Sequence, residues 1–319
     1  MTDSPIDDAQ RPRVRMITVD ERGDGQRVDN FVLRECPTVP KTRLYKAMRK
    51  GEIRVNKGRV KPEHRVHMGD IVRLPPLAVP SNAPKSVAPQ GWQERLERSI
   101  VFEDEFLMAI NKPSGLAVHG GSGLNFGMIE TLRVMREDLR FLELVHRLDR
   151  DTSGLILVAK KPGALKALHG LLRNRNGIRK RYLGLVAGRW PSHLRDVDAP
   201  LLKQERASGE RIVKVAKDGQ SSLTNFRIRE RFAAHTLIEA SPITGRTHQI
   251  RVHAQSVGFP LLGDDKYANE QSSKATSHLR LKRLFLHAEQ LRFKLDDRVY
   301  ELKAEIDKEL EVVLNKTRN

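Results

Sequence analysis

The run HRLDRDTSG, residues 146–154, gathers the side chains of this chain that are best suited to reaction chemistry. A carboxylate can act as a base or a nucleophile there, and the arginines can hold an anionic substrate. The apolar stretch Leu155–Ala159 follows directly and is typical of a buried strand. Because loops at strand ends commonly carry reactive groups, we expect this run at the edge of a sheet. Two other interpretations stay open: a salt-bridged turn formed by Asp149 or Asp151, and a metal site formed by both with His146.

Two further runs could contribute to the same chemistry. Residues 244–253, TGRTHQIRVH, place two arginines and two histidines close together, as either a phosphate clamp or a surface ion-pair network. Residues 179–182, RKRY, put three cations and an aromatic ring at the start of an apolar strand, where a core tyrosine is the simpler interpretation. The glycine-rich residues 119–123, HGGSG, would let backbone approach a ligand closely. No G-x-S-x-G, H-E-x-x-H or G-x-x-x-x-G-K-[ST] motif accompanies these runs.

The composition restricts the class of protein that carries these residues. The chain has 319 residues, with 58 Lys+Arg against 40 Asp+Glu and a formal net charge of +18, which favours a nucleic-acid partner over an ordinary basic protein. The single cysteine, Cys36, excludes an intramolecular disulfide and a Cys-rich zinc site. Apolar runs stay well below the roughly 18 residues of a membrane helix, and residues 1–10 lack a secretory signal pattern. We therefore expect a cytoplasmic protein with no membrane partner.

The positive charge is concentrated in a short N-terminal region. Eleven basic residues and three acidic ones lie between Lys41 and Arg73, which is typical of phosphate-backbone binding. The spacing predicts a helix from Val28, a helix over 41–50 ended by Gly51, and strands near 53–55 and 71–74. The candidate RNA contacts of this region are Lys41, Arg43, Lys46, Arg49, Lys50 and Arg54.

A proline-rich stretch marks the boundary between two domains. Five prolines between 75 and 90 predict an extended, semi-stiff linker. We therefore expect a disordered or extended segment over 1–25, a small basic domain over 26–75, a linker over 76–91 and a large domain over 92–319. In the large domain, short β-like runs alternate with helical patterns, and the polar residues 269–277 are predicted to form a loop. Residues 1–13 are predicted to be disordered.

Several separated motifs then resemble known families. Residues 27–29 (RVD), 49–56 (RKGEIRVN) and 69–70 (GD) resemble an S4-like RNA-binding module over about 26–74. The three polar runs described above, together with 111–115 (NKPSG) and 263–267 (GDDKY), resemble the RluA-type pseudouridine synthases, in that family's order, over about 98–305. Within this family, the resemblance is greatest to the enzymes that modify large-subunit (23S) ribosomal RNA.

The resemblance implies a fold and a reaction. The fold is α+β, a mixed and mainly antiparallel sheet with flanking helices, preceded by a small α/β RNA-binding domain. The reaction detaches uracil from the sugar at nitrogen 1 and rejoins it through carbon 5, an isomerisation that requires no cofactor and no metal. Asp149 is implied to be the essential carboxylate, as nucleophile or base. Arg251 is implied to keep it ionised, and Tyr182 to stack on the uracil.

Further residues are implied to handle the RNA. The target uridine must leave its helix, and Arg147 is implied to enter the vacated space. Arg246 is expected to contact RNA or support the site, and His146 to support the structure or contact phosphate. The expected partner is large-subunit ribosomal RNA, in a precursor or assembly intermediate, bound by a monomer. The same chemistry on transfer RNA and a non-catalytic RNA-binding assembly factor remain as alternatives.

Overall fold

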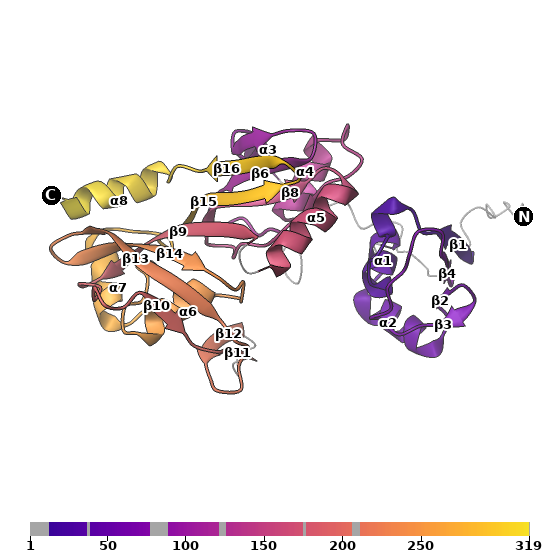
Figure 1. The fold of residues 1–319 in the computed structure, drawn as a ribbon, viewed down its shortest axis with the longest axis horizontal. Coiled ribbons are helices and arrows are strands. Elements are labelled where there is room, and N and C mark those ends of the chain that lie inside the picture. Colours follow the sequence, from indigo (N-terminus) through magenta and orange to yellow (C-terminus); the bar gives the residue numbers. More distant parts are fainter. Residues whose placement is uncertain are drawn as a thin grey trace, which may run out of the picture. The chain divides into compact units, whose positions relative to one another are not determined.

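The computed structural model describes residues 13–36, 39–76, 89–120, 126–174, 177–205 and 211–318. The chain divides into two compact units, residues 1–86 and 87–319, which are described separately (Figure 1). Residues 1–12 of the segment predicted to be disordered and residues 77–88 of the proline-rich linker lie outside the described residues.

The N-terminal unit packs two helices against a small sheet. Its elements are β1 (Arg15–Thr18), η2 (Glu21–Gly23), α1 (Val28–Glu35), α2 (Lys41–Lys50), β2 (Arg54–Val55), β3 (Gly58–Arg59) and β4 (Ile71–Leu74). The strand order is β1-β4-β2-β3. The predicted helix over 41–50 is confirmed, and Gly51 ends it in the left-handed conformation with φ +69°.

The sheet of this unit includes a strand that precedes the predicted range of 26–75. Strand β1 pairs antiparallel with β4, with Arg15 opposite Leu74 and Thr18 opposite Ile71. The pattern was missed because β1 lies at the edge of the sheet and is mostly exposed, leaving no alternation of apolar residues.

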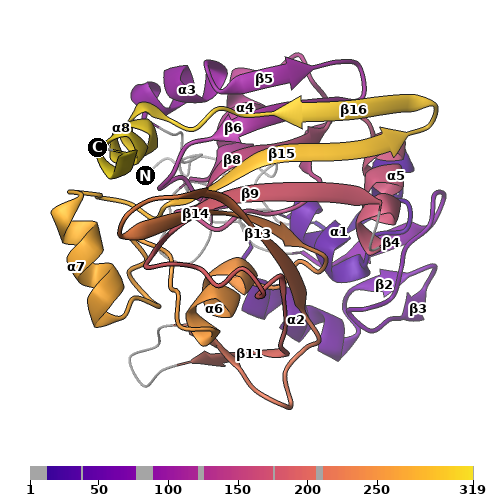
Figure 2. The same cartoon turned by 60° about the vertical axis from the view of Figure 1, so that its left-hand side comes forward.

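The C-terminal unit is built on one large sheet (Figures 1 and 2). Its first elements are α3 (Gln90–Glu97), β5 (Ile100–Glu103), β6 (Leu107–Lys112), α4 (Met128–Met135), β7 (Glu143–Leu144), β8 (Ser153–Ala159), α5 (Pro162–Arg173), β9 (Ile178–Ala187) and β10 (Asp196–Asp198). There follow β11 (Leu201–Glu205), β12 (Arg211–Val215), β13 (Leu223–Arg231), β14 (His235–Pro242), α6 (Gln249–Ser256), α7 (Glu270–His278), β15 (Leu286–Leu295), β16 (Arg298–Lys303) and α8 (Lys308–Arg318). The main strand order is β10-β13-β14-β9-β15-β8-β6-β5, with β16 beside β15 and β7 beside β8. The α+β fold is confirmed.

One local prediction for this unit is wrong. Residues 269–277 were expected to form a loop, but Asn269 is the N-cap of α7 and residues 270–277 lie in this helix. A capping box starts this helix, in which the Asn269 side chain accepts from the Ser272 backbone and Ser272 reciprocates. A polar composition hid the helix because α7 has few apolar positions. Helix α3 starts at Gln90, within the last residues of the range predicted for the linker.

One pair of adjacent strands in the sheet is parallel, next to the loop formed by residues 146–152. Strands β8 and β15 run parallel, with Gly154 opposite Ala288, whereas the other pairs of adjacent strands among the described residues are antiparallel. Ala288 is also opposite Tyr182 on β9, and Gly154 is opposite Lys112 on β6. Gly154 has φ +105°, and a Cβ atom there would lie 2.3 Å from the carbonyl oxygen of Ala288. This crossing therefore requires glycine, and it brings the start of β8 into line with Tyr182.

Candidate active site

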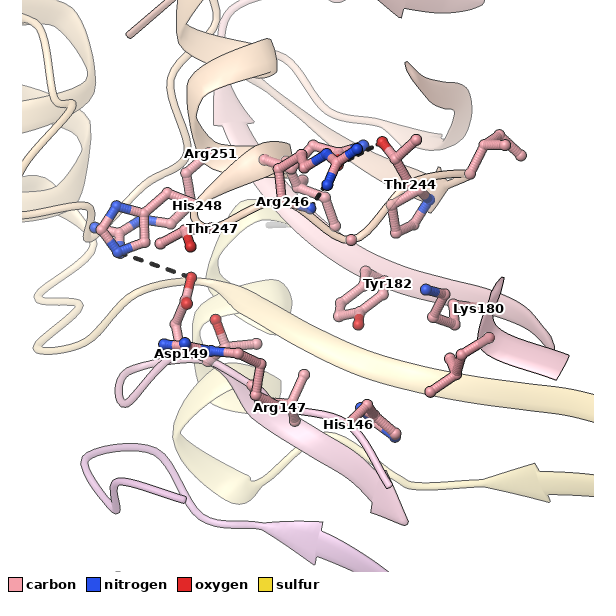
Figure 3. A pocket seen from close by; sticks show the side chains of 18 of the residues that line it. His146, Arg147, Asp149, Lys180, Tyr182, Thr244, Arg246, Thr247, His248 and Arg251 are labelled. Atoms are coloured by element: carbon pink, nitrogen blue, oxygen red, sulfur yellow. Dashed lines mark hydrogen bonds and ion pairs between the residues drawn. The ribbon is translucent and has the colours of Figure 1, made fainter. Parts of the chain in front are cut away.

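The three polar runs meet at one pocket of about 630 Å³ (Figure 3). The lining residues that had been selected from the sequence are His146, Arg147, Asp149, Tyr182, Arg246 and Arg251. They come from the loop before β8, from β9, and from the loop and first turn of α6. Asp149 and Tyr182 lie on facing sides of the space in Figure 3. The structure thus brings together residues that are up to 105 positions apart in the chain.

Backbone contacts fix the Asp149 loop. The carbonyl of Asp149 accepts a hydrogen bond from the backbone N–H of Thr152 at 3.2 Å. The next carbonyl, that of Arg150, accepts from the N–H of Gly115 at 2.9 Å. The hydroxyl of Ser114 donates to the carbonyl of Asp151 at 2.7 Å. Residues 112–116 therefore act as a frame for the loop that carries the carboxylate.

Lys112 anchors this frame from inside the protein. Its side chain is fully buried, and Nζ donates to the carbonyls of Pro113, Leu116 and Arg150 at 2.9, 2.9 and 3.0 Å. Burial lowers the pKa of this amine to about 7, although the charges of Asp151 and Asp149 oppose the shift. Lys112 was not among the residues selected from the sequence, and its position in the motif NKPSG was the available signal.

Arg251 is held in place by the carboxylate of Asp264. Its guanidinium donates to both oxygens of Asp264, at 2.8 and 2.7 Å, and to Asp265 at 3.2 Å. Arg251 is therefore positioned by Asp264, which lies on the loop before α7. Burial works against the charged form, but the hydrogen bonds and charge of Asp264, with a smaller effect of Asp149, raise the pKa of Arg251. The permanent cation thus acts on Asp149 through space within the same pocket.

His248 lies next to Asp149 in the pocket. Its Nε2 atom lies 4.0 Å from Oδ2 of Asp149, and a dashed line marks the pair in Figure 3. His248 belongs to the run of residues 244–253 but was not selected as a site residue. Its position next to Asp149 depends on how the chain turns into α6, which the sequence pattern did not reveal.

Tyr182 and Lys180 project from the same face of β9, since they are two residues apart on a strand. Tyr182 is 8% exposed, and burial together with the charge of Asp149 raises the pKa of its phenol, so the ring stays neutral. Burial lowers the pKa of Lys180, which also lines the pocket. An aromatic ring beside a carboxylate is an arrangement that can hold an unstacked base next to a reactive group.

The remaining predicted residues divide into exposed and structural ones. Arg147 and Arg246 are exposed side chains that line the pocket, and Nε of Arg246 donates to the carbonyl of Ser221 at 3.3 Å. Nε2 of His146 instead accepts from the backbone N–H of Leu157 at 3.2 Å. Burial lowers the pKa of His146 to about 4, so its ring is neutral near pH 7. This arrangement favours the structural alternative for His146 over a phosphate contact.

The structure also bears on the two other interpretations of residues 146–154, the salt-bridged turn and the metal site. Of the two carboxylates that could form the salt-bridged turn, Asp151 forms it, through an ion pair with Arg150 at 2.9 Å. Within the described part of the chain, no group of three or more His, Cys, Asp or Glu side chains is arranged to hold a metal ion. None of the described helices is long and apolar enough to cross a membrane.

The N-terminal unit presents its cations on α2. Arg43, Lys46 and Lys50 line a shallow groove, and Arg49 is exposed beside them. Arg54 is partly buried and donates from Nε to the carbonyl of Gly51 at 3.0 Å, at the end of the same helix. The side chain of Lys41 lies outside the described atoms. The predicted RNA-contacting residues are thus grouped on α2 and the turn that follows it.

Comparisons with known proteins agree with this geometry. The RNA pseudouridylate synthase family matches residues 106–256, and the S4 domain matches residues 26–72. The chain is 51% identical to the ribosomal large subunit pseudouridine synthase C of Pasteurella multocida (strain Pm70), covering 96% of this chain and 94% of the relative. It is 48% identical to the protein of that name from Escherichia coli (strain K12), covering 97% and 98%. The solved structure of human RNA pseudouridylate synthase domain containing 4 has a TM-score of 0.60 and 26% identity, over 72% of this chain and 96% of that one.

These matches extend over both units of the chain. The family match includes the loop that carries Asp149, strand β9 with Tyr182, and the segment with Arg251. The S4 match includes α2 and its cations. The chain is therefore an isomerase that belongs to the RNA pseudouridine synthase family and carries an S4 domain before its catalytic unit.

Proposed function

We propose that this protein converts uridine to pseudouridine in large-subunit (23S) ribosomal RNA, the substrate class named for its curated relatives. The observation that carries the proposal is the convergence of Asp149, Tyr182 and Arg251 on one pocket. The reaction breaks the bond between nitrogen 1 of uracil and C1′ of the ribose, and forms a bond between carbon 5 and C1′. Carbon 5 loses a proton and nitrogen 1 gains one, so no oxidant, reductant or third substrate is consumed.

Asp149 supplies the carboxylate at the sugar. It either adds to C1′ as uracil departs or removes the proton at C2′, and its loop is held for this task by the frame at Lys112–Leu116. The charge of Arg251, fixed by Asp264, favours the ionised carboxylate in a partly buried site. Tyr182 provides the stacking surface on which the detached uracil can turn before carbon 5 faces C1′.

The outer residues act on the RNA strand. Extruding the uridine costs roughly a few kcal/mol, which must be recovered from new contacts. The exposed Arg147 is placed to enter the helix that the uridine leaves, and Arg246 to contact the backbone at the rim. The cations of α2 add affinity that does not depend on base sequence. A linker between the units would raise the local concentration of RNA at the pocket.

The finer expectations belong to the same proposal. The substrate is a precursor or assembly intermediate of the large subunit, since a target uridine is accessible before the subunit is complete. The enzyme acts as a monomer in the cytoplasm. Transfer RNA as substrate and a purely binding role are the competing possibilities.

The experiment compares three RNAs carrying tritium at carbon 5 of uracil. These are transcripts of large-subunit ribosomal RNA, small-subunit ribosomal RNA and a transfer RNA pool. Tritium release from the large-subunit RNA alone is expected, because carbon 5 exchanges its hydrogen only when it becomes bonded to the sugar. Release from transfer RNA alone would replace the substrate, and tight binding without release from any RNA would favour the assembly factor.

A further inference from the structure

His248 occupies a backbone conformation that few residues other than glycine adopt. It precedes α6 with φ +53° and ψ +19°, in the left-handed region. Such conformations are costly and are concentrated at functional sites, where the surrounding structure maintains them. The side chain of His248 is 14% exposed and its ring faces Asp149 in the pocket (Figure 3).

A chain of hydrogen bonds determines which ring nitrogen carries the proton. The hydroxyl of Tyr267 accepts from the backbone N–H of Val213, on β12, at 2.9 Å. The same hydroxyl lies 2.7 Å from Nδ1 of His248. The Val213 N–H occupies one acceptor site of this oxygen, and among the described residues Nδ1 of His248 is the acceptor within reach of the hydroxyl proton. The hydroxyl therefore donates to Nδ1 in the arrangement that satisfies both groups. The neutral ring then carries its own proton on Nε2, the atom that faces Asp149.

Tyr267 is itself rigidly placed. Its backbone N–H donates to Oδ1 of Asp264 at 3.0 Å, and the guanidinium of Arg251 lies 5.1 Å from the centre of its ring. Asp264 therefore holds both Arg251 and the tyrosine that orients His248. Arg251 and His248 both act on Asp149, and the positions of both depend on Asp264.

We propose that His248 is a positioning residue for Asp149, donating from Nε2 to Oδ2 and leaving Oδ1 free to act on the ribose. This inference rests on the proposed role of Asp149 as the reacting carboxylate. The separation of 4.0 Å is longer than a hydrogen bond, and the pair closes when a uridine fills the pocket and excludes water. Catalytic hydrogen bonds commonly shorten in this way when substrate binds.

Burial favours the neutral form of His248. Burial, followed by the cations Arg251 and Lys266, lowers the pKa of the imidazole, against the opposing effects of Asp149 and Asp264. A neutral ring donates one hydrogen bond to the carboxylate without forming a full ion pair, which would reduce the reactivity of Asp149. His248 orients the carboxylate while Arg251 supplies the charge.

Two substitutions separate a positioning role from a merely structural one. His248→Asn suits the left-handed backbone and places its amide near Nδ1, but it is too short to reach Asp149. His248→Gln extends an amide N–H toward the position of Nε2. We expect His248→Asn to lower the single-turnover rate by about 10- to 100-fold, the range for losing a hydrogen bond to a charged group. The RNA dissociation constant and melting temperature should stay at wild-type values, and His248→Gln should recover most of the rate.

A rate for His248→Asn within about twofold of wild type would overturn the inference, since a positioning contact must affect the rate. So would equal losses in both variants accompanied by weaker RNA binding, because that result describes an RNA contact. A second readout does not depend on activity. In protein containing ¹⁵N-labelled histidine, with the His248 signals assigned by their loss in His248→Asn, Nδ1 should be unprotonated and Nε2 protonated. The opposite tautomer would contradict the proposed hydrogen-bond chain even if the proposed reaction stands, whereas inactive wild-type enzyme with the expected tautomer would contradict only the reaction.

Discussion

Both carboxylate oxygens of Asp264 accept hydrogen bonds from the guanidinium of Arg251, at 2.7 and 2.8 Å. The side chain of Asp264 is 0% exposed and that of Arg251 is 2% exposed. Arg251 lines the Asp149 pocket, whereas Asp264, which holds it in place, does not line this pocket. The position of the cation, and hence its effect on Asp149, depends on this buried pair.

Replacing Asp264 should therefore affect both stability and catalysis. We expect Asp264→Asn to lower the free energy of unfolding by about 3–5 kcal/mol, because a buried guanidinium loses its compensating charge. Urea unfolding measures this change. Asp265→Asn is the matched control: its side chain is 63% exposed, and it contacts the same guanidinium at 3.2 Å. The control should change stability by less than about 1 kcal/mol, as exposed ion pairs do. Similar losses in both variants would contradict the argument.

Lys112 should stabilise the loop that carries Asp149. Lys112→Met removes the donor to three carbonyls while keeping an apolar chain of similar length. We expect a loss of about 1–3 kcal/mol in unfolding free energy, the cost of leaving buried acceptors unsatisfied. Lys161→Met, at a half-exposed lysine paired with Glu105, provides the comparison and should be nearly neutral. An unchanged or higher stability of Lys112→Met would show that its burial costs more than its hydrogen bonds contribute.

The crossing of β8 and β15 should tolerate no side chain at Gly154. In Gly154→Ala, the new Cβ would lie 2.3 Å from the carbonyl oxygen of Ala288, on a backbone with φ +105°. We expect a loss of at least about 3 kcal/mol or failure to accumulate folded protein. Gly163→Ala, in the first turn of α5 with open space around its Cβ, should be neutral or stabilising by up to about 1 kcal/mol. Thermal melting of both variants distinguishes the two positions.

His287 should make stability depend on pH. Its ring is 1% exposed, with Nε2 donating to the carbonyl of Ala304 at 3.0 Å and Nδ1 accepting from the Ser153 hydroxyl at 2.9 Å. Burial lowers the pKa of His287 to about 4, below its ordinary value of 6.5. The unfolded chain therefore binds the proton first, and the stabilisation present above pH 6.5 is lost as the pH falls toward 4.

The expected loss for this single histidine is about 1 kcal/mol between pH 6 and 5. Urea unfolding of wild type and His287→Gln at pH 7, 6 and 5 isolates the contribution, since the other histidines are common to both proteins. The wild type should lose stability more steeply than the variant. Parallel slopes would mean that His287 is protonated equally in both states.

Much of the site could be predicted from the sequence, because its motifs are contiguous runs that adjoin apolar strands. The runs that contain Asp149 and Tyr182 were found in this way, and the resemblance to the pseudouridine synthases implied the roles of the two residues. The helix of residues 41–50 was predicted from its spacing. The pairing of Arg251 with Asp264 could not be predicted, since spacing does not show which of several carboxylates an arginine will meet. Lys112 was missed because its three acceptors are backbone carbonyls, which carry no sequence signature. The role of His248 depends on a left-handed turn that only the folded chain defines.

The central claim is that Asp149 performs the isomerisation, and Asp149→Asn tests it most directly. The amide keeps the size of the side chain but removes the carboxylate that attacks the sugar or takes its proton. We predict that wild-type protein releases tritium from large-subunit ribosomal RNA labelled at carbon 5 of uracil. Asp149→Asn should bind the same RNA with unchanged affinity and release none. Release by the variant at a rate close to that of wild type would contradict the account.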